Sequence, residues 1–190
     1  YATLTGRYYA RVSGYRVEDA DYVIVGQGSV VADAEAVCDH LRETRKLKVG
    51  VLNVTMFRPF PADLITRMLR GKKAVTVLER VDQPLAVDPP LLREIRAAMT
   101  QALENGRVKG SLPYPTIASC RPDEMPDFHS GCFGLGGREL RSGDLIAAVD
   151  NMLGSSKRRQ FYLGVDFVRS DTRLPKLQIW QEQILDGYPH

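Results

Sequence analysis

The side chains that could perform chemistry in this sequence show no recognisable catalytic arrangement. They are His40, His129 and His190, with Cys38, Cys120 and Cys132. Nucleophilic catalysis needs a nucleophile within hydrogen-bond reach of a base, and no spacing in the sequence places a histidine beside a cysteine or serine in that way. No Cys-x-x-Cys, the spacing typical of zinc ribbons and iron–sulfur sites, is present. We therefore predict no catalytic residue and no metal site, and the odd number of widely spaced cysteines predicts reduced thiols in a cytoplasm.

A strand that runs into two glycines could instead hold a phosphate group. The apolar run Tyr22–Val25 is followed by Gly26 and Gly28, and Ser29 is placed to cap a helix. The third glycine of the dinucleotide-binding fingerprint would fall at Val31, and no acidic residue ends the next strand. We interpret the segment as a tight turn above a parallel strand. A phosphate resting on the start of the helix is the alternative.

Two loops carry an arginine at positions that suit a contact surface. Arg58 follows a predicted buried strand and precedes a proline, at the sheet edge where such folds place ligands; a solvated arginine is the alternative. In Gly134–Arg138, Gly136 and Gly137 could turn backbone amides toward an anion or admit another segment, and Arg138 could pair with a carboxylate or phosphate. The predicted contact residues are Gly28, Ser29, Arg58, Gly136, Gly137 and Arg138.

A third loop follows the third predicted strand and is rich in proline and aspartate. Asp82 and Asp88, with Arg80, could make polar contacts with a partner domain. A solvated loop without a partner is the alternative interpretation.

Alternating strands and helices are predicted to position these loops. The predicted order is strand Tyr22–Val25, helix Val30–Arg45, strand Val49–Val54, helix Pro61–Leu69, strand Ala74–Glu79, helix Leu91–Asn105, strand Pro115–Ser119 and a helix from Ser142 to Leu153. Gly106 is expected to end the helix Leu91–Asn105, and Ser142 to cap the last helix. This alternation predicts an α/β fold with a three-layer, doubly wound and mostly parallel sheet.

Length and charge limit the domain organisation and the class of partner. The 190 residues, 44% hydrophobic and 26% charged, fit one domain, which we place at residues 1–153, with 154–190 as a C-terminal extension or linker that ends in a helical pattern. The net charge of +3 is dispersed, so nucleic acid is not an expected partner. No apolar run reaches the ~20 residues that cross a bilayer, so we expect no membrane contact and a cytoplasmic location.

The order of the short motifs resembles a known family. The motifs are Gly6-Arg7-Tyr8, Asp19-Ala20-Asp21-Tyr22-Val23-Ile24-Val25 before Gly28-Ser29, Val49-Gly50-Val51-Leu52, Phe57-Arg58-Pro59-Phe60, Ala74-Val75-Thr76-Val77-Leu78-Glu79-Arg80 and Gly134-Leu135-Gly136-Gly137-Arg138. In this order they resemble core domain II of the pyruvate:ferredoxin (2-oxoacid:ferredoxin or flavodoxin) oxidoreductases, a domain similar to the transketolase C-terminal domain. The resemblance implies a part of an enzyme that oxidatively decarboxylates a 2-oxoacid to an acyl-coenzyme A.

The resemblance also implies how the cofactors and partners are distributed. Thiamine diphosphate, magnesium and iron–sulfur clusters are expected in the full enzyme and none in this segment, which would serve as an inactive, architectural contact domain. Its partners would be other domains or subunits of the oxidoreductase, with ferredoxin or flavodoxin as the electron acceptor of the whole. The stretch Asn105–Phe128 looks like an insertion relative to the family. Two alternatives are a transketolase-like domain of another thiamine enzyme and a stand-alone α/β module that binds a phosphorylated ligand or coenzyme.

Overall fold

A six-stranded sheet forms the middle layer of the molecule in the computed structural model, which describes residues 2–6, 9–165, 185 and 187. The strand order is β1-β3-β2-β4-β5-β6. The strands are β1 (Val12–Tyr15), β2 (Tyr22–Gly26), β3 (Val49–Val54), β4 (Ala74–Glu79), β5 (Asp127–Cys132) and β6 (Gln160–Tyr162). Only β1 runs antiparallel to its neighbour, so the predicted α/β class with a mostly parallel sheet is confirmed.

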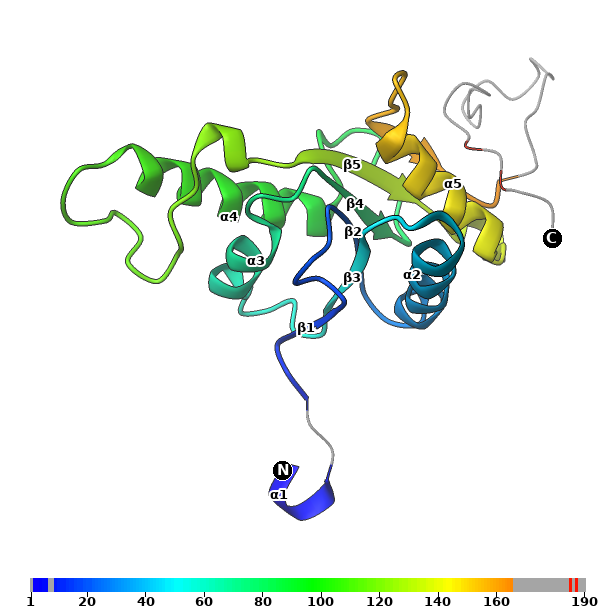
Figure 1. Ribbon diagram of the computed structural model, residues 1–190, viewed down its shortest axis with the longest axis horizontal. Coiled ribbons are helices and arrows are strands. Elements are labelled where there is room, and N and C mark those ends of the chain that lie inside the picture. The colour runs from blue at the N-terminus through cyan, green and yellow to red at the C-terminus, as the bar shows by residue number, and fades with distance from the viewer. Residues whose placement is uncertain (1, 7–8, 166–184, 186, 188–190) are drawn as a thin grey trace.

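Helices cover both faces of this sheet. They are α1 (Ala2–Thr5), α2 (Val30–Arg45), α3 (Ala62–Leu69), α4 (Pro90–Arg107) and α5 (Ser142–Leu153), with short 3₁₀ turns at Pro122–Glu124 and Leu135–Gly137. Figure 1 shows α3 and α4 on one side of the sheet and α2 and α5 on the other, while α1 projects from the body. The three layers are therefore those predicted from the alternation of strands and helices.

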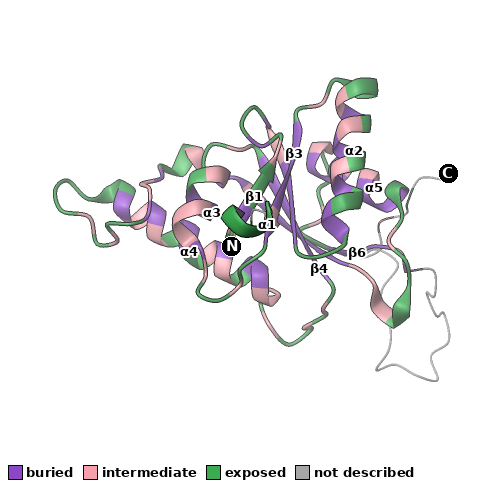
Figure 2. Ribbon diagram, turned by 90° about the horizontal axis from the view of Figure 1, so that it is seen from below, coloured by how far each residue is buried: buried purple, intermediate pink, exposed green. Residues whose placement is uncertain are grey.

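Two separate cores follow from the alternation of side chains along the strands. Val23, Val25 and Val77 point toward α3 and α4, while Ile24 and Leu78 point toward α2 and α5. Because both faces are covered, the central strands are buried along most of their length, as their purple colour in Figure 2 shows. Every residue of β4 is buried. This rigid middle fixes the loops at the strand ends.

The strand expected at Pro115–Ser119 is absent, and this prediction was wrong. That segment is a turn held by the buried Asn105 side chain, whose amide donates to the carbonyls of Tyr114 and Ile117 at 2.8 Å each. The fourth parallel strand is β5, which begins inside the stretch interpreted as an insertion. Its His-Ser-Gly-Cys sequence lacks the β-branched residues that announce a buried strand, so propensity pointed to the wrong segment.

The end of one helix and the capping of two others differ from the predictions. Gly106 lies inside α4 rather than ending it, and a glycine is required there because a Cβ would come 2.1 Å from the Cys120 carbonyl oxygen. Ser29 precedes α2 as expected, but its side chain makes no capping hydrogen bond. Ser142 is the first residue of α5 rather than its cap; the residue before it, Arg141, has its amide bonded to the Asp144 carboxylate at 2.9 Å.

The C-terminal part of the chain contributes an edge strand to the same sheet. β6 pairs in parallel with β5, and Phe161 is 2% exposed within the core on the α2 and α5 side. The helical pattern expected near residues 176–185 falls mainly outside the described residues. The division at 153/154 stays a prediction.

Candidate functional site

The predicted contact residues gather at one edge of the sheet. Gly28 and Ser29 follow β2, Arg58 follows β3, and the loop 134–138 follows β5. Because β2, β3, β4 and β5 are mutually parallel, all of these segments lie beyond the carboxyl ends of the strands. This edge is where open α/β sheets bind ligands and partners.

The glycines among them take conformations that suit exposed turns. Gly28, Gly136 and Gly137 have φ values of +75°, +64° and +74°, and a Cβ at any of the three would meet no atom within 4 Å. The requirement for glycine at these positions is therefore conformational and not steric. Arg138 and Ser29 are exposed beside them.

Arg58 is fixed on the surface by three contacts. Its guanidinium lies 2.8 Å from a carboxylate oxygen of Glu94 on α4, donates to the carbonyl of Phe57 at 3.0 Å, and stacks 4.1 Å from the centre of the Phe57 ring. The peptide bond from Arg58 to Pro59 is cis. The side chain is nevertheless 59% exposed, so a positioned cation is available to a neighbour.

An open cleft of about 380 Å³ lies at this edge, and none of the six predicted contact residues lines it. It is lined by Gln27, Phe57, Leu78, Glu79, Arg80, Val81, Pro90, Leu91 and Phe133. The chain leaves β2 toward β3 on one side and places β4 on the other, so the cleft opens where the strand order reverses. At this switch point the connections that follow β2 and β4 lead to opposite sides of the sheet.

Arg80 borders this cleft and was not among the predicted contact residues. A Cβ at Gly134 would come 2.8 Å from the Arg80 Nε, so this glycine lets the arginine stem lie against the loop after β5. Among the described residues, Arg80 has no ion-pair partner. The sequence indicated Arg80 only as a possible polar contact for a partner domain, together with Asp82 and Asp88. Its place at this cleft could not be predicted, because its packing against Gly134 joins segments more than fifty positions apart.

Glu79 forms the floor of the cleft as a buried carboxylate. Its two oxygens accept the backbone amides of Leu91 at 2.6 Å and Leu92 at 3.1 Å, in the first turn of α4. Burial raises the pKa of Glu79 despite these bonds. The carboxylate thus satisfies two amides that an α-helix leaves unpaired, and we assign it a structural role.

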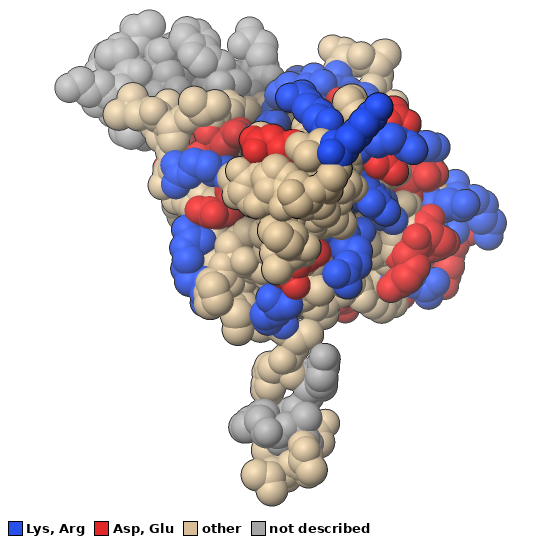
Figure 3. All heavy atoms as spheres, turned by 90° about the vertical axis from the view of Figure 1, so that its left-hand side faces the viewer, with Lys and Arg blue, Asp and Glu red and all other residues tan. Residues whose placement is uncertain are grey.

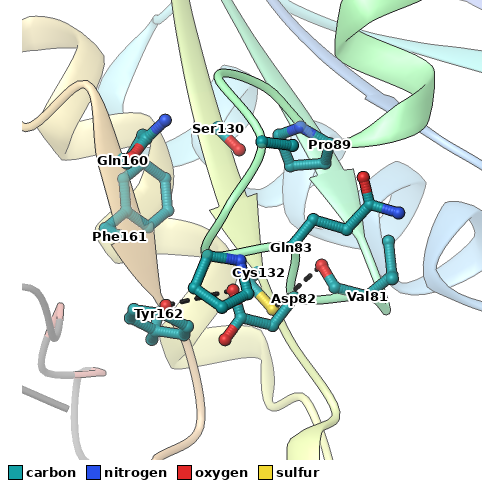
Figure 4. A pocket seen from close by; sticks show the side chains of 11 residues that line it. Val81, Asp82, Gln83, Pro89, Ser130, Cys132, Gln160, Phe161 and Tyr162 are labelled. Carbon is teal, nitrogen blue, oxygen red and sulfur yellow. Dashed lines mark hydrogen bonds between the residues drawn. The ribbon is translucent and has the colours of Figure 1, made fainter.

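A second and smaller pocket, of about 150 Å³, lies between β6 and the loop from β4 to α4. Figure 4 shows the Tyr162 hydroxyl donating to the Asp82 carboxylate, at 3.2 Å, and the Cys132 thiol directed at the carbonyl of Val81, at 3.4 Å. Burial raises the pKa of the Cys132 thiol to about 12, and that of Tyr162 to about 12 with a further contribution from Asp82. A thiol with such a pKa is not a nucleophile near neutral pH.

The described residues do not fit a metal or an iron–sulfur cluster. No group of three histidine, cysteine or acidic side chains comes together within them. Cys38, Cys120 and Cys132 are all buried, and each thiol is directed at a different backbone carbonyl. No helix in the described part of the chain is long and apolar enough to cross a membrane.

Three comparisons with known proteins agree with one another. Residues 20–112 match the family model "Pyruvate:ferredoxin oxidoreductase core domain II". The pyruvate synthase subunit PorA of Thermotoga maritima is 32% identical over 162 residues, which cover 84% of this chain and 36% of that protein. The probable pyruvate-flavodoxin oxidoreductase of Escherichia coli is 29% identical, over 87% of this chain and 13% of that protein. The chain therefore spans only part of these relatives.

A solved structure shows the same fold. The 2-oxoglutarate:ferredoxin oxidoreductase from Magnetococcus marinus, determined with 2-oxoglutarate, coenzyme A and succinyl-CoA bound, matches with a TM-score of 0.51 and 19% identity. The match covers 80% of this chain and 21% of that one. The predicted resemblance is confirmed: residues 20–112 match core domain II of the pyruvate:ferredoxin oxidoreductases, and proteins named for this activity are similar over most of this chain.

Proposed function

We propose that this chain is a non-catalytic contact domain of a larger, thiamine-diphosphate-dependent 2-oxoacid:ferredoxin or flavodoxin oxidoreductase. The full enzyme would convert a 2-oxoacid and coenzyme A to an acyl-coenzyme A. The names of the relatives support this reaction class, and their greater length supports a role as one part of the assembly. Thiamine diphosphate, magnesium and iron–sulfur clusters would then bind to other parts of the enzyme. The three free cysteines favour a cytoplasmic location.

The observation that carries the proposal is the chemistry of the carboxyl edge. Across the described residues this edge presents glycine turns and the arginines Arg58, Arg80 and Arg138, whereas the nearest thiol, Cys132, is buried with a raised pKa. Arginine is suited to pairing with carboxylates and phosphates and does not act as a nucleophile or base near neutral pH. The edge is equipped to hold a neighbour rather than to carry out a reaction.

Turnover assays test the proposal directly. We expect the chain alone, supplied with pyruvate or 2-oxoglutarate, thiamine diphosphate, magnesium and coenzyme A, to leave a viologen acceptor unreduced, whereas the full oxidoreductase reduces it. Coenzyme A-dependent reduction by the chain alone would contradict the proposal. In the full enzyme, Arg58→Ala is expected to lower the temperature of heat inactivation, while the exposed control Lys109→Ala leaves it unchanged.

The open cleft supports one second candidate, a module that binds a phosphorylated ligand or coenzyme. Its support is Arg80, which borders a cleft of about 380 Å³ without an ion-pair partner among the described residues. Calorimetry of the chain with coenzyme A and with adenine nucleotides separates the candidates. A contact domain should bind none of them tightly, and a binding module should lose its affinity on Arg80→Ala.

A further inference from the structure

The loop from β4 to α4, residues 80–89, presents two aliphatic side chains to solvent. Leu85 is 102% exposed and Val87 is 88% exposed. Single exposed apolar residues are common on protein surfaces, so exposure alone does not indicate a binding site. These two stand two positions apart on one loop, beyond the carboxyl end of the central strand β4.

Hydrogen bonds and an ion pair hold this loop in place along its length. The Gln160 side-chain amide donates to the carbonyl of Val87 at 3.0 Å, and the Tyr162 hydroxyl donates to Asp82 at 3.2 Å. Arg96 of α4 pairs with Asp88 at 2.8 Å. Within the loop, the Ala86 amide donates to the carbonyl of Gln83 at 2.9 Å. Figure 4 shows the loop running beside β6, with Gln160 and Tyr162 facing it.

These hydrogen bonds and the ion pair hold the two apolar side chains in a fixed orientation toward solvent. A loose loop could fold Leu85 and Val87 back onto the protein, whereas a loop bonded to β6 and α4 holds them outward. Ordering the loop before contact removes part of the entropy cost that association otherwise carries. Fixed apolar side chains at a sheet edge are typical of an interface, where buried anchors dominate the binding energy.

The charges beside the loop indicate the chemistry of its partner. Asp82 accepts the Tyr162 hydroxyl but pairs with no lysine or arginine within the described part of the chain. A partner should therefore offer an apolar hollow for Leu85 and Val87 with a basic side chain opposite Asp82. Figure 3 shows one face of the molecule, on which acidic and basic side chains are intermixed around an uncharged central area.

We propose that the β4–α4 loop is a preorganised docking segment. It inserts Leu85 and Val87 into an apolar hollow, flanked by a basic side chain, on another domain of the same oxidoreductase. The length of the relatives supports another domain of the enzyme as the partner. This chain spans 36% of one relative and 13% of another, and the other domains of such an enzyme must pack against some surface of this one. The inference rests on the proposed function.

Amide hydrogen exchange in the full oxidoreductase tests the docking. We expect the amides of residues 80–83 and 85–88 to exchange roughly tenfold or more slowly in the assembled enzyme than in the chain alone. The double variant Leu85→Asp with Val87→Asp should restore the faster exchange. The control Val108→Asp should not, since this 41% exposed valine lies at the other end of α4, about 27 Å away along an 18-residue helix. In the chain alone, both variants should have the same melting temperature as the wild type.

The possible outcomes distinguish a failure of the docking proposal from a failure of the proposed function. Equal exchange of the loop in the enzyme and in the chain, with the enzyme assembled, would overturn the docking and leave the proposed function standing. Failure of the chain to assemble with any other part would overturn the proposed function itself. Protection that grows with the concentration of the chain alone would assign the loop to a second copy, and protection only on adding ferredoxin or flavodoxin would assign it to the electron carrier; either would overturn the inference.

Discussion

His129 shows how a polar side chain is held inside the sheet. It is fully buried on β5, and its Nδ1 lies 2.9 Å from the carbonyl oxygen of Arg158, which can only accept, so Nδ1 carries the proton. Asn151 on α5 donates to the same carbonyl at 2.9 Å and accepts the Arg158 amide at 2.8 Å. The sequence predicted no role for this histidine beyond a loop position, because its partners are twenty and more residues away.

We expect His129 to make stability fall at acid pH. Burial lowers its pKa in the folded chain, so the neutral form is favoured there, while the unfolded chain takes up a proton near pH 6.5. The stabilisation is therefore present above about pH 6.5 and is lost as the pH falls toward the lowered value, by up to about 1.4 kcal/mol per pH unit. Urea unfolding from pH 8 to 5.5 should show this loss in the wild type relative to His129→Gln. Parallel curves would contradict it.

Substitution of Gly106 by alanine is predicted to destabilise the fold, although Gly106 lies in a helix. Alanine normally stabilises a helix interior by about 1 kcal/mol relative to glycine. Here its Cβ would come 2.1 Å from the Cys120 carbonyl oxygen, and the Cys120 amide is tied to the Ala102 carbonyl at 2.8 Å. Gly106→Ala should therefore destabilise the fold, by about 1–3 kcal/mol, in urea unfolding. Gly154→Ala is the matched control, since its Cβ would find no atom closer than 3.5 Å.

At the scale of elements, periodicity predicted the helices and central strands well. The apolar spacing of α2 and α4 and the continuous apolar runs of β3 and β4 placed these elements within about two residues. β1 and β5 were not predicted, because their stability comes from pairing with distant strands and not from local composition. The six contact residues follow from their positions after strands, and their roles stay predictions. The position of Arg80 at the cleft could not be predicted, because it depends on packing against Gly134, which is distant in the sequence.

Arg42 is expected to join helix α2 to the first part of the sheet. Its Nε donates to the carbonyl of Val49 at 2.6 Å, and its two terminal nitrogens reach Asp19 at 3.0 and 2.8 Å and the carbonyl of Arg16 at 2.9 Å. Arg42→Met should lower the free energy of unfolding by about 1.5–3 kcal/mol. Arg42→Lys should not rescue it, since an ammonium cannot reproduce this fork.

A neighbouring ion pair provides the control for this prediction. Arg45 pairs with Asp150 at 2.7 Å, and its side chain is 42% exposed. Exposed pairs contribute about 0–1 kcal/mol, so Arg45→Met should change the urea midpoint much less than Arg42→Met. Equal losses in the two variants would show that the hydrogen bonds from Arg42 to the Val49 and Arg16 carbonyls are not its main contribution.

At the scale of the whole molecule, the sheet continues past the predicted domain boundary. β6 lies beyond residue 153, yet the Leu163 amide donates to the carbonyl of Cys132 and the Ser130 amide to the carbonyl of Arg159, each at 2.8 Å. Together with the buried Phe161, these bonds make residues 154–165 part of the same folded unit in the structure. Composition changes at Gly154 because the chain passes through a polar turn before it rejoins the sheet.

A truncation series decides whether the fold can be completed without this edge strand. A fragment of residues 1–165 keeps Phe161 and Leu163, which are 2% and 0% exposed, whereas a fragment of residues 1–153 removes both and opens the core on the α2 and α5 side. Burying one such side chain contributes about 1.5–3 kcal/mol, so the shorter fragment should lose several kcal/mol in urea unfolding and expose apolar surface to a hydrophobic dye. Equal midpoints for the two fragments would mean that the stable unit ends at residue 153, as the sequence alone predicted, and that β6 only covers an already complete core.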